Sequence, residues 1–238
     1  MEPITIREIV EAVDGRLLGE FDQLDQTVTH VFTDSRKPDP GALFIPLVGE
    51  RFDGHAFIND ALAGGAAGCF TQRERESYLP GKFYIKVNST QKALRDLARW
   101  YKKRFDIPFV AITGSVGKTT TKVAAVLGER FKVLKTEGNF NNEVGLPLTL
   151  LRLNSTHEIC VLEMGMNHFG EIEYLSAIVE PDVAVITNIG DSHIENLGSR
   201  ENILKAKCEI FAHMDPEKGF VVLNGDDPLL QGLRPQLP

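Results

Sequence analysis

The sequence predicts an α/β fold, with a small amino-terminal α/β domain followed by a doubly wound, mainly parallel domain of the phosphate-loop type. Three observations support this prediction. From residue 107 onward, strand-like and helix-like segments alternate. The strand-like segments "FVAIT", "EICVLEM" and "DVAVITN" are apolar almost throughout, as expected of strands buried on both faces of a parallel sheet. The first of them runs directly into the glycine-containing loop "TGSVGKTT".

Residues 1–106 are predicted to form the first domain. A short helix opens it, and Thr5 and Glu8 have the spacing of a capping box at its start. Its apolar stripe consists of Ile6, Ile9, Val10 and Val13. The segments "TVTHVFT" and "ALFIPLV" are expected to be short strands between turns, and "STQKALRDLARWYKKRF" is expected to be an amphipathic helix that ends the domain.

Residues 107–238 are predicted to form the second domain. Helices are expected from about residue 118 to 130, over "GEIEYLSAIV" and over "ENILKAKCEIFAHM", with a last strand at "FVVLN". Right-handed crossovers between parallel strands then build a doubly wound sheet. Ligands of such sheets bind at the carboxyl edge, where polar residues follow several of these strands.

Composition and charge exclude several classes of function. The 238 residues carry a formal net charge of −7, which argues against a nucleic-acid groove or an anionic membrane surface as the main partner. No apolar run approaches the length of a membrane span, and the amino terminus lacks the pattern of a secretory signal. The three cysteines are far apart and lack metal-ligand spacing. We therefore expect a cytoplasmic protein.

The loop "TGSVGKTT" predicts a nucleotide triphosphate site. Glycines allow the backbone N–H groups to wrap around phosphate oxygens, and the helix that follows directs its positive end at the same anion. Lys118 is expected to neutralise the β- and γ-phosphates, and the Thr119 hydroxyl to face Mg²⁺. The loop departs from the strict pattern G-x-x-x-x-G-K-[ST], since Ile112 occupies the position of the first glycine. The predicted nucleotide-binding residues are Thr113, Gly114, Ser115, Val116, Gly117, Lys118, Thr119 and Thr120.

Two further polar residues follow strands of the same sheet. Glu163 ends "ICVLE", where a carboxylate beside a phosphate loop is well placed to assist a metal ion. His193 follows the next strand, in "TNIGDSHIEN". Lys205 and Lys207 lie two residues apart on a helix and so face different directions, and spacing alone does not choose between them.

Five blocks of the chain, taken in order, resemble the central domain of the Mur ligases. They are "VAITGSVGKTTTKVAAVL", "TEGNFNNEVGLPLTLLRL", "VLEMGMNHFGEIEYLS", "AVITNIGDSHIENLGSRENILKAKCEIF" and "VLNGDD". Upstream, "TDSRKPDPGALFIPLVGERFDGHAFINDALAGGAAG" resembles the UDP-sugar-binding domain of the same family. The resemblance covers nearly the whole chain and is strongest to the branch that adds a dipeptide.

The resemblance implies roles for individual residues. Lys118, Glu163, His193 and Lys207 match catalytic positions, and Thr119, Glu163 and His193 match the magnesium side of the site. Lys207 falls where relatives carry a carbamylated lysine, a modification that would replace an ammonium with a carboxylate-like group beside the metal. The substrate-facing matches are Ser35, Arg36, Asn139, Asn141, Asn142, Asn167 and His168.

The implied reaction uses ATP and Mg²⁺ to join D-alanyl-D-alanine to UDP-N-acetylmuramoyl-tripeptide through an acyl phosphate, in peptidoglycan synthesis. Family members continue well beyond residue 238, so the chain is expected to be a fragment that does not complete ligation alone. Three alternatives stay open at this stage. They are another ligase of the same fold (adding the third amino acid, or making folylpolyglutamate), a phosphate-loop kinase or GTPase, and a non-catalytic nucleotide-binding module.

Overall fold

The computed structural model describes residues 1–49, 52–115 and 119–233. It divides the chain into two compact units, Met1–Tyr101 and Lys102–Pro238. The sequence placed this boundary five residues later, after residue 106. Lys102, the first residue of the second unit, contacts that unit with its side chain, since its ammonium lies 4.5 Å from the centre of the Phe109 ring and 3.9 Å from the Glu180 carboxylate.

The first unit is built on a five-stranded sheet of order β2-β7-β6-β5-β4. Only the β2–β7 pair is antiparallel. The strands are β2 (Arg16–Leu18), β7 (Phe83–Lys86), β6 (Gly68–Thr71), β5 (Leu43–Phe44) and β4 (Val31–Phe32). A separate antiparallel pair joins β1 (Ile4–Thr5) to β3 (Thr27–Val28).

The helices of this unit begin and end close to where the sequence predicts them. Helix α1 spans Ile6–Ala12, and the expected capping box is confirmed, since Glu8 N donates to Thr5 Oγ1 and Thr5 N donates to Glu8 Oε2. A 3₁₀ turn (Gly54–Phe57) leads into α2 (Ile58–Ala63), and α3 spans Thr90–Lys102. Ile58, Ala61 and Leu62 of α2 pack in one core with Phe44 and Tyr84 of the sheet.

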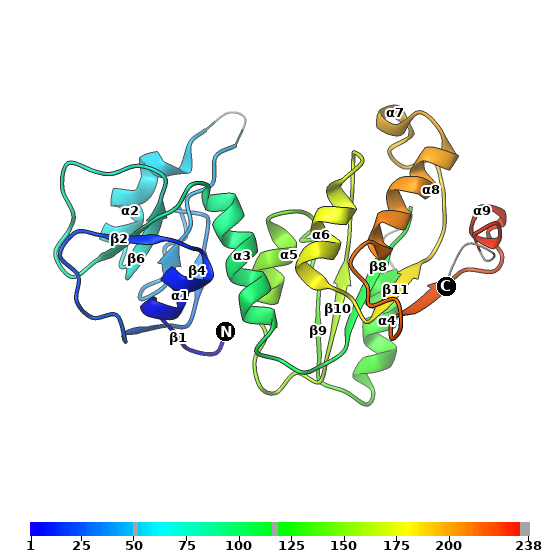
Figure 1. Cartoon of the computed structure of the whole chain (residues 1–238), viewed down its shortest axis with the longest axis horizontal. Coiled ribbons are helices and arrows are strands. Elements are labelled where there is room, and N and C mark those ends of the chain that lie inside the picture. The colour runs from blue at the N-terminus through cyan, green and yellow to red at the C-terminus, as the bar shows by residue number, and fades with distance from the viewer. Residues whose placement is uncertain (50–51, 116–118, 234–238) are drawn as a thin grey trace. The chain divides into compact units, whose positions relative to one another are not determined.

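The second unit is built on a five-stranded sheet in which every pair is parallel, as predicted (Figure 1). Its order is β12-β11-β8-β10-β9, so that the first strand along the chain, β8, lies at the centre. The strands are β8 (Phe109–Thr113), β9 (Val133–Lys135), β10 (Ile159–Glu163), β11 (Val183–Ile186) and β12 (Phe220–Leu223). All five residues of β8 are buried, which explains its apolar sequence.

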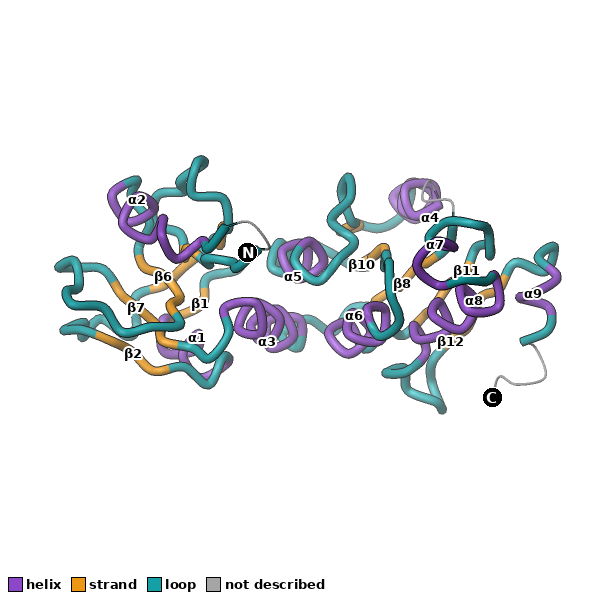
Figure 2. The backbone as a smooth tube through the Cα atoms, turned by 90° about the horizontal axis from the view of Figure 1, so that it is seen from above, coloured by secondary structure: helices purple, strands orange, loops and turns teal. Residues whose placement is uncertain are grey.

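Helices cover both faces of this sheet, as the doubly wound prediction requires. Figure 2 shows α4 (Thr119–Gly128) on one side of β8 and β10, and α6 (Glu171–Val179) on the other. Helix α5 spans Gly145–Leu150. Ala124 of α4 packs with Val110, Ile112 and Val161 of the strands. The remaining helices are α7 (Ile194–Leu197), α8 (Arg200–Cys208), a 3₁₀ turn (Glu209–Phe211) and α9 (Pro228–Gln231). Among the described residues, none of the helices has both the length and the apolar character needed to cross a bilayer.

The register of the parallel strands brings several polar residues to one edge. Ile112 of β8 pairs with Glu163 of β10, and Thr113 of β8 pairs with Ile186 of β11. Strands β8, β10 and β11 therefore end at almost the same level. The segments that follow them emerge side by side at the carboxyl edge, where ligands of open parallel sheets bind.

Gly68 of β6 has no room for a side chain, since a Cβ there would lie 2.3 Å from the backbone oxygen of Phe83 and 2.4 Å from its ring. We expect Gly68→Ala to lower the free energy of unfolding of the first unit by about 1–3 kcal/mol, the usual cost of overpacking. Gly128→Ala is the matched control, because a Cβ at Gly128 meets nothing within 4 Å. Urea denaturation of both variants tests this, and equal stabilities would contradict it.

Candidate functional site

The phosphate-loop segment begins at the centre of the carboxyl edge. Thr113 ends β8 and is buried, and a Cβ on Gly114 would lie 1.9 Å from Thr187 Oγ1, so a larger residue would displace the neighbouring loop. Thr119 begins α4, and Thr120 in its first turn is buried. Val116, Gly117 and Lys118 lie outside the described residues.

Ser115 joins the start of this loop to the segment that follows β11. Ser115 N donates to Asn188 Oδ1 at 3.0 Å, and Ser115 Oγ accepts from Gly190 N at 2.8 Å. The Ser192 hydroxyl donates to the Ser115 carbonyl oxygen at 3.0 Å. These three hydrogen bonds connect the phosphate-loop segment directly to the loop that carries His193.

Asp227 supports the same loop from the other side. Asp227 Oδ2 accepts from Ile189 N at 2.7 Å, while its Oδ1 accepts from Leu229 N and Leu230 N at the start of α9. One carboxylate thus caps a helix and orients the loop after β11. It does so through charge-assisted hydrogen bonds to backbone N–H groups, which are stronger than neutral ones.

Glu163 and Lys207 form the charged centre of the edge. Glu163 Oε1 accepts from Asn141 Nδ2 at 3.0 Å, and Glu163 N donates to Thr136 Oγ1 at 2.9 Å. Lys207, on α8, is only 2% exposed, and its Nζ donates to Thr113 Oγ1 at 3.4 Å. The structure therefore distinguishes Lys207 from Lys205, which their spacing in the sequence could not do. Lys207 is buried and Lys205 is exposed.

Burial lowers the pKa of Lys207 from 10.5 to about 8, and the nearby Glu163 carboxylate opposes this shift only in part. Removing an ammonium from water disfavours its charged form. Lys207 is therefore a buried amine that lies beside a carboxylate and gives up its proton more readily than an ordinary lysine.

His193 has an unusual backbone conformation for a non-glycine residue. It precedes α7 with a φ of 68°, in the left-handed region, and it is exposed. A paired contact holds the adjoining loop, because Arg200 Nε and Nη2 donate to the two carboxylate oxygens of Asp191 at 2.6 and 2.8 Å. A strained conformation held by its surroundings is typical of functional loops.

The donor set at this edge suits magnesium bound with phosphate. No group of three His, Cys, Asp or Glu side chains that could hold a metal ion occurs among residues 1–49, 52–115 and 119–233. Magnesium sites commonly use one or two carboxylates and take their other ligands from water and substrate phosphates. The Glu163 carboxylate beside the phosphate-loop segment meets that requirement.

The predicted asparagines have different surroundings. Asn141 contacts Glu163, as described above, and Asn142 Oδ1 accepts from Val144 N and Gly145 N and so caps the start of α5. Asn139 lies in an exposed turn. Asn167 and His168 both contact Glu171, through Asn167 N at 2.6 Å from Oε2 and His168 Nδ1 at 3.1 Å from Oε1.

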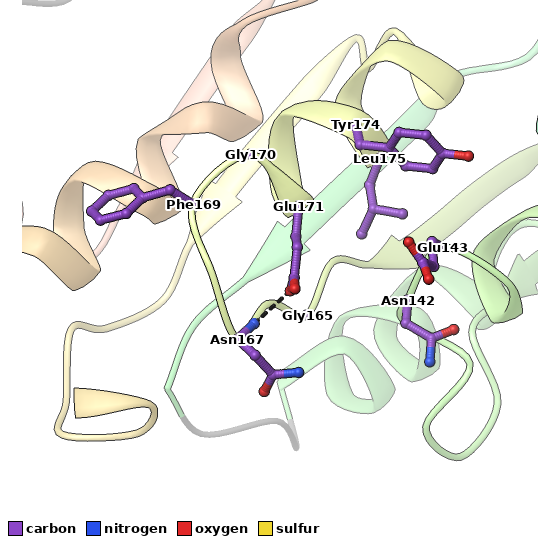
Figure 3. Close-up of a pocket in the computed structure, with 9 residues that line it drawn as sticks. All are labelled: Asn142, Glu143, Gly165, Asn167, Phe169, Gly170, Glu171, Tyr174 and Leu175. Carbon is purple, nitrogen blue, oxygen red and sulfur yellow. Dashed lines mark hydrogen bonds between the residues drawn. The ribbon is translucent and has the colours of Figure 1, made fainter. Parts of the chain in front are cut away.

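A cavity of about 490 Å³ lies beside these residues (Figure 3). Its walls come from the loop before α5, the segment after β10 and the first turns of α6. The lining residues are Asn142, Glu143, Gly165, Asn167, Phe169, Gly170, Glu171, Tyr174 and Leu175.

The two remaining predicted residues, Ser35 and Arg36, belong to the first unit. They line a cavity of about 670 Å³ whose apolar wall includes Phe44 and Phe52. Arg36 Nε and Nη2 donate to the two oxygens of Asp34 at 2.8 and 2.9 Å, and this pairing lowers the pKa of Asp34 to about 2. An apolar cavity with an oriented guanidinium at its rim has the composition of a site for a planar ring that carries an anionic group.

Several residues of these sites had no predicted role. Polar residues around Asn188 and Asp227 follow strands in the sequence, but the sequence does not indicate their contacts with Ser115 and Ile189. Glu143 and Tyr174 were not singled out. The available signal for Tyr174 was its place on the first turns of a helix that begins at the carboxyl edge.

Asp227→Ala should release the loop after β11, because Ile189 N and the start of α9 lose their shared acceptor. We expect faster hydrogen exchange at Ile189 and a loss of about 1–2 kcal/mol in the free energy of unfolding of the second unit. Asp226→Ala is the matched control, since the described residues give the Asp226 side chain no hydrogen-bond partner. Indistinguishable exchange at Ile189 in the two variants would contradict this assignment.

Lys207→Met should stabilise the chain at pH 7. The shift of the Lys207 pKa from 10.5 to about 8 corresponds to a burial cost of about 3 kcal/mol. That cost is complete below pH 8 and is relieved as the pH rises from about 8 toward 10.5, because the unfolded chain then binds the extra proton.

We therefore expect the stability advantage of Lys207→Met over wild type to shrink between pH 8 and pH 10. Thermal unfolding across this range measures it, in buffer freed of carbon dioxide so that the Lys207 amine stays unmodified. Lys205→Met, at an exposed position of the same helix, serves as the control with little change. An advantage that grows with pH would contradict the direction of the pKa shift.

Two family models match the chain. The model of the Mur ligase middle domain matches residues 112–237, which include the whole carboxyl edge of the parallel sheet. A second model, the catalytic domain of the Mur ligase family, matches residues 27–102.

Individual relatives agree with these matches. The chain is 48% identical over 230 residues to UDP-N-acetylmuramoyl-tripeptide--D-alanyl-D-alanine ligase of Bacillus subtilis, covering 95% of this chain and 50% of the relative. A structure from Acinetobacter baumannii, named UDP-N-acetylmuramoylalanyl-D-glutamyl-2,6-diaminopimelate--D-alanyl-D-alanyl ligase, matches with a TM-score of 0.88 at 35% identity, over 99% of this chain and 52% of that one. The MurF ligase of Thermotoga maritima in complex with ADP matches with a TM-score of 0.78 at 38% identity, over 87% of this chain and 48% of that one.

The chain thus spans about half the length of the curated relatives it matches. Each unit contains a match to the same family, at residues 27–102 and at residues 112–237. The described site residues lie within these two ranges. The chain belongs to the Mur ligase family.

Proposed function

We propose that the protein to which this chain belongs uses ATP to add D-alanyl-D-alanine to UDP-N-acetylmuramoyl-tripeptide, in the synthesis of peptidoglycan precursors. One observation carries the proposal. Thr113 at the start of the phosphate loop, the Glu163 carboxylate and the buried Lys207 amine lie at one edge of a parallel sheet, in a chain 48% identical to a ligase of that name. ATP dependence and a nucleotide-linked sugar substrate are consistent with a reaction in the cytoplasm.

The first unit supplies the proposed sugar-nucleotide site. The cavity beside Ser35 and Arg36 offers Phe44 and Phe52 for an apolar ring face and a guanidinium for phosphate oxygens. Because Asp34 already orients Arg36, little side-chain freedom is lost when a ligand binds.

The second unit supplies the proposed site of amide-bond formation. A carboxylate is a poor electrophile, so the terminal carboxylate of the peptide first attacks the γ-phosphorus of ATP, ADP leaves, and an acyl phosphate forms. The amine of D-alanyl-D-alanine then attacks the acyl carbon, and phosphate leaves as the amine loses a proton. Both partners of the first step are anions, so Lys118 and the positive end of α4 have the task of screening their repulsion.

We assign Glu163 to hold magnesium, together with the Thr119 hydroxyl and His193, as the family resemblance implies. Bound magnesium would screen the charge of the phosphate oxygens and orient the γ-phosphate. Asn141 and Thr136 fix the Glu163 backbone and carboxylate, which keeps that oxygen ligand in place.

The proposed role of Lys207 follows from its burial. An ammonium beside a metal-binding carboxylate opposes cation binding, whereas a carbamate at the same nitrogen supports it. A neutral amine is the form that adds carbon dioxide, and a pKa of about 8 makes that form more abundant than in an exposed lysine. We therefore propose that Lys207 is carbamylated in the active protein.

Calorimetric titration of the 238-residue chain tests the proposal by treating its two units separately. UDP-N-acetylmuramoyl-tripeptide and Mg²⁺-ATP are titrated in turn into wild type, Arg36→Ala and Lys118→Ala. We expect Arg36→Ala to lower the affinity for the sugar peptide about tenfold with ATP binding unchanged, because a charge-assisted phosphate contact is lost. Lys118→Ala should show the reverse pattern.

Lys122→Ala is the matched control for Lys118→Ala, since Lys122 is exposed on the same helix. Failure of wild type to bind either ligand would contradict the proposal. A preference for guanine nucleotides over ATP would instead favour a phosphate-loop GTPase.

A further inference from the structure

The cavity of about 490 Å³ in the second unit begins next to the proposed site of phosphoryl transfer. Gly165, which lines it, is two residues after Glu163, so their Cα atoms are at most about 7 Å apart. Asn141 joins the two, because its side chain donates to Glu163 and its carbonyl oxygen accepts from Gly165 N at 2.9 Å. A group in this cavity is therefore close to whatever reacts beside Glu163.

Charged groups of the wall are acidic. In Figure 3, Glu171 and Asn167 lie on one side of the cavity, Glu143 and Asn142 lie on the other, and Tyr174 is near the Glu143 side. None of the nine lining residues is a lysine or an arginine. The wall therefore offers two carboxylates, amide oxygens and aromatic surface.

The two carboxylates differ in how they are held. Partial burial raises the pKa of Glu171, but the hydrogen bonds from Asn167 and His168 outweigh this effect and keep the pKa below its usual value. Glu171 is therefore an oriented, ionised group. Glu143 makes no hydrogen bond or ion pair within the described part of the chain, so its carboxylate is available to a ligand.

We propose that this cavity binds the side-chain ammonium of the third residue of the peptide substrate, with Glu143 as its main carboxylate partner. The proposal rests on the proposed function and adds a specificity site to it. An ammonium fits a cavity with two carboxylates, amide oxygens and an aromatic ring. The sugar nucleotide and the peptide backbone are otherwise anionic, so the side-chain amine is the one part of the substrate that this wall attracts.

Position and chemistry both favour the third residue. Its own carboxylate is the one activated beside Glu163, so its side chain starts within a few bonds of that point. The name of the Acinetobacter baumannii ligase gives 2,6-diaminopimelate as the residue that precedes D-alanyl-D-alanine. The side chain of that residue ends in an amine and a carboxylate, and only the amine suits the acidic wall.

The other amine of the reaction is a poorer occupant. The amine of D-alanyl-D-alanine has to be neutral to attack the acyl phosphate. Two carboxylates around it would raise its pKa and keep it protonated. The cavity thus suits an ammonium that stays charged throughout the reaction.

The test compares two peptides on two variants by calorimetry, with the whole 238-residue chain. The ligands are UDP-N-acetylmuramoyl-tripeptide with L-lysine as third residue and the same molecule with the lysine amine acetylated. We expect wild type to bind the free amine about tenfold more tightly, the factor typical of losing one charge-assisted contact. In Glu143→Gln this preference should fall to about twofold or less, through weaker binding of the free amine alone.

Glu217→Gln is the matched control, because Glu217 is an exposed glutamate of the same unit outside both cavities, and it should keep the full preference. Equal binding of both peptides by wild type would overturn the inference and leave the proposed function intact. Binding of neither peptide would overturn both. If Glu143→Gln weakened the binding of D-alanyl-D-alanine but not the preference between the peptides, the cavity would hold the attacking amine, and the inference would be wrong.

Discussion

The central strand β8 is the constraint on which the candidate site depends. Both of its neighbours pair with it in parallel, and the register sets Ile112 opposite Glu163 and Thr113 opposite Ile186. A parallel sheet brings the carboxyl ends of its strands to one edge, and a buried central strand leaves its partners little freedom to slip. The strand register alone therefore brings the start of the phosphate loop, Glu163 and the loop of His193 to the same edge of the sheet.

Hydrogen bonds then hold the loops that follow β8 and β11 in place. Ser115 ties the phosphate-loop segment to Asn188, Gly190 and Ser192, and Asp227 holds the same loop from the side of α9. These hydrogen bonds therefore hold the two loops in place relative to one another. Such orientation before binding is what electrostatic catalysis requires, because dipoles that are already aligned need not reorganise during the reaction.

Sequence patterns anticipated the parts of this arrangement that are local. Apolar strands, the capping box at Thr5 and the glycine loop are each encoded within a few residues, so fold class and the main edge could be predicted. The choice of Lys207 over Lys205 could not be made from spacing, because it depends on which face of α8 is buried. The cavity with Glu143 and Tyr174 was missed because three separate segments form its wall. The boundary between the units lies at Lys102 rather than after residue 106, and the contact of Lys102 with Glu180, which is distant in sequence, could not be predicted from local patterns.

The charge of the chain bears on the proposed reaction, because both partners of its first step are anions. The net charge of −7 repels ATP and a nucleotide sugar at long range, so binding depends on a few local cations and helix ends. Arg36 in the first unit, and Lys118 with the start of α4 in the second, are the groups proposed to supply that attraction. In the proposals made above, the carboxylates at the same edge favour cations over further anions, with magnesium at Glu163 and an ammonium at Glu143. A third residue with a lysine side chain would bring a cation close to the reacting carboxylate and so lower the local excess of negative charge on binding. The same arrangement of carboxylates would then have two consequences. It would favour a third residue with a side-chain amine, and it would reduce the repulsion between the anionic groups of the site.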